Sequence, residues 1–95
     1  MTEPNALVLP VVHHNGSGRV ALMEQQHKAN MAVNAAISAL LEAMPHGRDY
    51  YPLGDDAWGR AHLQAMDRVV ALQKVQLEIE QIYQSLLPFH SEEKP

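Results

Sequence analysis

A run without glycine or proline, residues 19–44, constrains the fold of this chain more than any other feature. The run is rich in alanine, the residue with the highest helix propensity. It is followed by Pro45 and Gly47, which are typical of helix ends. The sequence therefore predicts a helix over residues 19–44, with Ser17 or Gly18 as its N-cap.

A second helix is predicted over residues 55–87, between an N-cap at Asp55 or Asp56 and the helix-breaking Pro88. Its apolar side chains recur at three- and four-residue steps and form two neighbouring lines. The first line consists of Trp58, Ala65, Val69, Leu72, Ile79 and Leu86. The second line consists of Leu63, Met66, Val70 and Leu77. The opposite side of this helix is polar, so its apolar face is wide.

The fold predicted from these elements is all-α: a long antiparallel two-helix hairpin, closed by a turn at residues 45–54. One partner helix covers only a narrow seam, so much of the apolar face is left open. We therefore expect hairpins to associate into a helical bundle, as a dimer or a higher oligomer. The alternative is a monomer whose N-terminal arm folds back over the open face.

A single domain is expected over residues 1–95. Residues 1–12 read as an extended arm, because Pro10 interrupts a β-branched apolar stretch, and residues 88–95 read as a frayed tail.

Composition excludes several classes of function. The chain has no cysteine, so it forms neither a disulfide nor a thiolate metal site. Its net charge of -4 argues against a DNA-binding surface. No apolar run approaches the roughly 20 residues that cross a bilayer, so we expect no membrane partner. The absence of cysteine suits a reducing cytoplasm, where we expect the chain to be located. Since it contains no H-E-x-x-H string and no serine in a nucleophile elbow, we expect no enzyme activity, catalytic residue, metal or cofactor.

One polar cluster, H-H-N-G-S-G-R, precedes the first helix. We expect Asn15-Gly16 to form a tight turn with positive φ and Ser17 to cap the helix. Free amides at a helix start attract anions, and Arg19 adds a positive charge. The alternative is an ordinary turn and cap without a ligand.

The other polar cluster, P-H-G-R-D-Y-Y-P-L, lies in the predicted turn and contains two of the three tyrosines. Arg48 offers a planar fork for phosphate or carboxylate, and Asp49 can orient it or accept a hydrogen bond from a ligand. Tyr50 and Tyr51 offer rings for stacking. The alternative is that the rings plug one end of the bundle while Asp49 pairs with Arg48.

The two polar clusters lie at opposite ends of one hairpin, so an antiparallel pair of hairpins would bring them together from different chains. A ligand site between subunits is then predicted, with Asn15, Gly16, Ser17 and Arg19 from one chain and Arg48, Asp49, Tyr50 and Tyr51 from the other.

A polar ladder on the first helix, Gln26, Asn30 and Asn34 with His27 beside it, leaves two alternatives. It is either a solvated face or the wall of a pocket that hydrogen-bonds a ligand.

The strings N-G-S and G-R-D-Y-Y-P, each followed by a long helix, resemble a family of short helical proteins of tailed phages and prophages. Members share a His-x-Asn-Gly-Ser/Thr turn and an Arg-Asp-Tyr-Tyr turn, and the likeness covers roughly residues 5–84. Most members are accessory proteins of unassigned function.

In architecture and setting, the chain is also similar to the phage sponge proteins that sequester nucleotide immune signals. This resemblance implies a non-enzymatic homo-oligomer in the cytoplasm of an infected bacterial cell, with a nucleotide-like anion bound between subunits. The alternative function is a protein–protein interaction module: an adaptor, a virion-associated protein or an inhibitor of a host protein.

Overall fold

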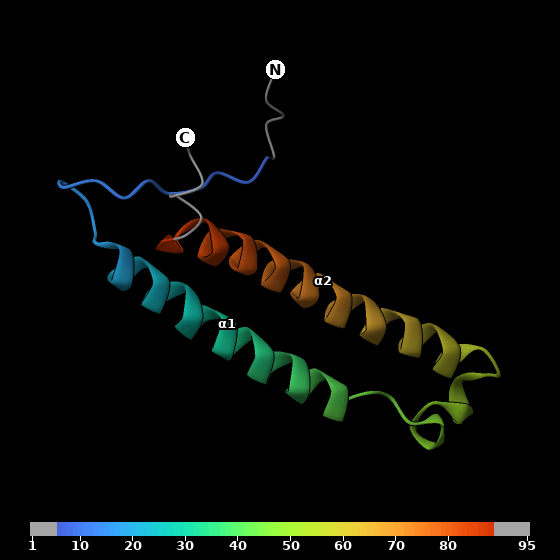
Figure 1. Cartoon of the computed structure of the whole chain (residues 1–95). Coiled ribbons are helices and arrows are strands. Elements are labelled where there is room, and N and C mark those ends of the chain that lie inside the picture. The colour runs from blue at the N-terminus through green and yellow to red at the C-terminus, as the bar shows by residue number, and fades with distance from the viewer. Residues whose placement is uncertain (1–5, 89–95) are drawn as a thin grey trace. The chain divides into compact units, whose positions relative to one another are not determined.

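A computed structural model describes residues 6–88 of the chain (Figure 1). Within this range the fold is a helical hairpin of two α-helices packed against each other, without a strand. Helix α1 spans Arg19–Glu42 and α2 spans Ala57–Ser85, with the short 3-10 helices η1 (Gly47–Asp49) and η2 (Tyr51–Leu53) between them. The all-α hairpin is thereby confirmed. The predicted arm and tail lie partly outside the described residues, at positions 1–5 and 89–95.

The chain divides into two compact units, and each contains one segment of either helix. Unit 1 combines Met1–Met31 with Leu77–Pro95, and unit 2 is the continuous stretch Ala32–Gln76. The turn with its two 3-10 helices belongs to unit 2, where it joins the end of α1 to the start of α2 (Figure 1).

Both α-helices are shorter than predicted, because their last turns tighten before a proline. The predicted end of the first helix was Met44, but α1 ends at Glu42, and the Met44 N–H bonds the Leu41 carbonyl three residues back. A residue before proline is disfavoured in the helical conformation, which explains the early end. Helix α2 likewise ends at Ser85, and the Leu87 N–H bonds the carbonyl three residues earlier.

The turn between the helices reverses the chain through consecutive 3-10 hydrogen bonds. The N–H groups of Asp49 and Tyr50 bond to the carbonyls of His46 and Gly47, and those of Leu53 and Gly54 bond to Tyr50 and Tyr51. The turn ends at Gly54, whose φ of 118° and ψ of 167° lie in a region that only glycine adopts readily.

Replacing Gly54 by alanine should lower the free energy of unfolding by about 1–3 kcal/mol, because a Cβ strains this backbone conformation. Urea unfolding followed by circular dichroism measures the effect. Gly47→Ala is the matched control: it lies in the same turn, its φ is not positive, and an added Cβ meets nothing within 4 Å. Equal losses in both variants would show that the Gly54 conformation is not the cause.

The two apolar lines of α2 differ in burial, apart from Trp58 of the first line and Met66 of the second, which are 42% and 37% exposed. In the first line, Ala65, Val69 and Leu86 are only 6%, 3% and 2% exposed. In the second line, Leu63 and Leu77 are 65% exposed and Val70 is 55% exposed. The expectation that one partner helix leaves part of the wide face open is therefore confirmed.

The apolar side chains of the N-terminal arm differ in exposure. Residues 7–13 have no regular secondary structure, and Val8 and Val11 are 85% and 74% exposed. Leu7, Leu9 and Val12 are only 37%, 45% and 39% exposed. Part of the apolar surface of the arm is therefore covered within the single chain, and the monomer with a covering arm stays an alternative.

Candidate functional site

The first polar cluster forms a four-residue turn ahead of α1. The Gly16 N–H donates to the His13 carbonyl at 3.1 Å, which makes His14 and Asn15 the central residues. The prediction of a positive φ at Asn15-Gly16 is wrong, because Gly54 is the only residue among 6–88 that has a positive φ. Glycine at the last position of such a turn needs no positive φ, since that conformation is required only of central residues in other turn types.

Helix α1 begins directly after this turn, with a glycine as its N-cap residue. The Leu22 N–H donates to the Gly18 carbonyl at 3.1 Å, so Gly18 is the N-cap residue, one of the two that were predicted. Asn15, Gly16 and Ser17 are exposed, while Arg19 is half-buried. These four predicted site residues lie together in unit 1.

The second polar cluster leaves most of its side chains in solvent. Arg48 and Asp49 are exposed, Tyr50 is half-buried, and Tyr51 is 76% exposed. Tyr51 therefore does not plug the end of a helical core within its own chain. All four residues lie in unit 2.

No ion pair joins Arg48 to Asp49 in the described part of the chain, so that alternative is wrong. The ion pair near the start of α2 is instead between Arg60 Nε and Asp56 Oδ2, at 3.4 Å. The Arg48 guanidinium is consequently available to a ligand or to another protein.

Trp58 fastens the turn, a role that the sequence did not suggest. Its Nε1–H donates to the Pro45 carbonyl at 3.0 Å, which ties the end of α1 to the start of α2. Its ring also lies against His62, with ring centroids 5.2 Å apart. Trp58 therefore links the residue that follows the last turn of α1 to the first turn of α2.

The charge of the turn is unfavourable for an anion. Asp49, Asp55 and Asp56 are all exposed there, while Arg48 is the cation of the turn itself. Arg60, which follows on α2, is already paired with Asp56. The turn of one chain alone is thus a poor anion site, and a second chain would have to supply positive groups.

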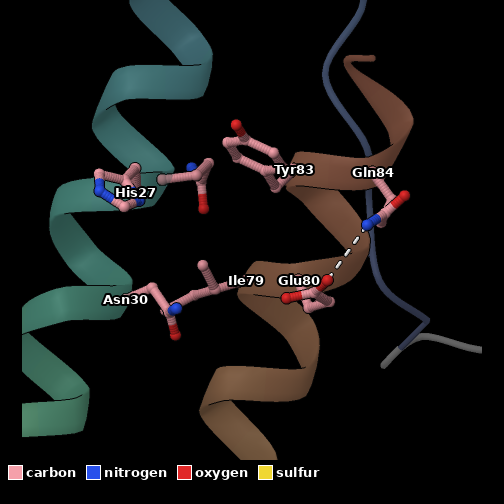
Figure 2. A pocket seen from close by; sticks show the side chains of 7 residues that line it. His27, Asn30, Ile79, Glu80, Tyr83 and Gln84 are labelled. Atoms are coloured by element: carbon pink, nitrogen blue, oxygen red, sulfur yellow. Dashed lines mark hydrogen bonds between the residues drawn. The ribbon is translucent and has the colours of Figure 1, made fainter. Parts of the chain in front are cut away.

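Part of the polar ladder on α1 lines a cleft within unit 1 (Figure 2). The cleft has a volume of about 220 Å³ and is lined by Gln26, His27, Asn30, Ile79, Glu80, Tyr83 and Gln84. In Figure 2, Ile79 and Tyr83 extend from α2 toward α1, and Asn30 extends from α1 toward α2. The pocket-wall alternative is thus favoured for Gln26 and Asn30, whereas Asn34 belongs to unit 2 and does not line this cleft.

Sequence reasoning missed the contribution of α2 to this cleft. Gln84 Nε2 donates to Glu80 Oε2 at 3.1 Å, one helical turn away, so the two polar side chains form one edge (Figure 2). A neighbouring hollow of about 280 Å³ shares His27 and Tyr83 and adds Glu24. Neither hollow is lined by lysine or arginine. This chemistry does not suit a phosphate-bearing ligand.

Residues 6–88 contain no group of three side chains that could hold a metal ion, and no helix among them is long and apolar enough to cross a membrane. Comparison with known protein families, with curated proteins and with solved structures finds no match to the chain. Fold and site together therefore define a short helical hairpin with an exposed apolar line on α2 and an exposed Arg-Tyr turn.

Proposed function

We propose that this chain works as a non-enzymatic, self-associating protein–protein interaction module. Its docking surface is the second line of α2, which a single hairpin leaves exposed. The observation that carries the proposal is the contrast between neighbouring residues on α2: Val69 is 3% exposed and Val70 is 55% exposed.

The energetic argument rests on the small core. Only five hydrophobic residues are buried in the described part of the chain: Ile37, Ala57, Ala65, Val69 and Leu86. A chain of this size is marginally stable unless something besides its own core contributes. Full burial of a valine, leucine or methionine side chain stabilises by about 1.5–3 kcal/mol, so covering the second line contributes on the order of several kcal/mol.

Sedimentation velocity over a concentration series tests the proposal. We expect a mass at least twice the 10.6 kDa of the chain at micromolar concentration, with dissociation on dilution. A species of 10.6 kDa at every concentration up to about 100 times that range would overturn it.

A second candidate function is favoured by the exposed turn: binding of a nucleotide-like anion between subunits, which would sequester a host signal in the cytoplasm. Tyr51, at 76% exposure, offers a ring for stacking, and the unpaired Arg48 offers a fork for phosphate. The acidic surroundings of the turn require that another subunit adds its helix start and Arg19. This candidate therefore depends on self-association.

If the second candidate is right, Arg48→Ala and Tyr51→Ala should each weaken binding of a cyclic dinucleotide by at least about tenfold, the loss expected for one charge-assisted or stacking contact. Calorimetry against a panel of cyclic nucleotides measures this. Arg60→Ala is the control, since Arg60 is paired with Asp56 and lies outside the predicted site. Absence of binding by the wild-type oligomer would exclude the candidate, whereas the interaction module would stand.

A further inference from the structure

The second line of α2 has a regular spacing that bears on what covers it. Leu63, Val70 and Leu77 are seven residues apart, and Met66 lies between the first two. Helix α2 is uninterrupted from Ala57 to Ser85, so residues seven apart return to nearly the same side of it. This is the spacing with which one helix packs along another.

Two exposed charges flank the second line on one side. Asp67 directly follows Met66, and Lys74 lies seven residues further along α2. Both side chains are exposed, and the ion pair found among residues 6–88 involves neither of them. Each charge is therefore available to a group outside its own chain.

The positions of these charges agree with those of the apolar residues. Val70 lies midway between Leu63 and Leu77, and the midpoint of Asp67 and Lys74 falls between Val70 and Ala71. A two-fold axis at this point makes the surface complementary to itself: apolar residues meet apolar residues, and each aspartate meets a lysine. In a parallel pair in register, Asp67 would instead lie level with Asp67 and Lys74 with Lys74, without attraction.

We infer that the occupant of the second line is a second copy of this chain, packed antiparallel with Asp67 of each copy beside Lys74 of the other. The inference rests on the proposed self-association and specifies its geometry. Packing of the second lines supplies most of the stabilisation, and the two exposed ion pairs, worth only about 0–1 kcal/mol each, select the orientation and register.

This register has a consequence for the two polar clusters. Along the helix axis, Ala57 of one copy lies at the same height as Gln84 of the other. The Arg48–Tyr51 turn of one copy therefore lies just beyond the end of α2 in its partner. In unit 1, the start of α1 lies at that end of α2, because Val20 and Met23 line a hollow together with Tyr83. In the inferred register, the start of α1 in one copy and the turn of the other thus lie at the same end of the pair.

Cysteine cross-linking tests the orientation, because the chain has no cysteine of its own. Distances along the helix axis separate the two possible pairs. In the inferred register, Met66 of one copy lies within about 3 Å of Leu77 of the other along this axis, whereas the Met66 residues of the two copies lie roughly 13 Å apart along it. A disulfide needs Cα atoms within about 7 Å. Mixing Met66→Cys protein with Leu77→Cys protein should therefore give a cross-linked dimer under mild oxidation, and either variant alone should give little.

Three outcomes are distinguishable by non-reducing electrophoresis and sedimentation. Cross-linking only in the mixture supports the antiparallel register. Efficient cross-linking of Met66→Cys protein by itself shows a parallel pair and overturns the inference, although self-association stands. Wild-type protein that remains a monomer overturns the proposed function as well. Gln64→Cys, exposed on the polar side of α2, is the control for random collision.

Discussion

Replacing Val69 by aspartate should leave most of the chain unfolded. Val69 is 3% exposed and lies in the first line of α2, so the new carboxylate would be removed from water. An uncompensated buried charge costs several kcal/mol, and small domains have a total stability of only about 5–15 kcal/mol. With five buried hydrophobic residues described in the chain, little remains to offset that cost.

Circular dichroism at 222 nm, recorded from low temperature upward, measures the loss of helix in Val69→Asp protein. We expect most of the helical signal to disappear and no cooperative thermal transition to remain. Val69→Ile serves as a control that keeps the site apolar. A Val69→Asp protein with the helical signal and melting temperature of the wild type would show that the first line is not the core.

Helix positions followed from the sequence because they depend on local features. Residues 19–44 contain neither glycine nor proline, and the structure places α1 at Arg19–Glu42 within that run. The two apolar lines were also readable, because a helix repeats its faces every three to four residues. Only packing decides which line is covered, and the structure shows that it is the first.

The details of the turn could not be derived from local sequence. The hydrogen bond from Trp58 to Pro45 joins residues that are 13 positions apart, so it depends on how the helices meet. Without knowledge of this hydrogen bond, the two tyrosines of the turn could equally be expected to pack over the end of the helical core. Only one wall of the cleft could be predicted, because the cleft also depends on how the helices meet. Gln26 and Asn30 lie four residues apart in the sequence, whereas Glu80 and Tyr83 come close to them only in the folded chain.

Replacing Val70 by aspartate should prevent the proposed self-association while leaving the helical hairpin folded. Val70 adjoins Val69 in sequence but is 55% exposed, so the carboxylate can remain in water in a single chain. In the inferred antiparallel pair, Val70 lies next to the two-fold axis, and the new carboxylates of both copies would be buried close together. Like charges and desolvation should then raise the dissociation constant at least about 100-fold, or roughly 2.7 kcal/mol.

Sedimentation velocity and circular dichroism together measure this effect. We expect a monomer with near-wild-type helical signal at low temperature. Its melting temperature should be lower and independent of concentration, whereas that of the wild type should rise with concentration, because association stabilises the folded chain. Gln64→Asp, exposed on the polar side of the same helix, should leave the oligomer intact. An oligomer that tolerates Val70→Asp as well as it tolerates Gln64→Asp would place the interface elsewhere on the hairpin.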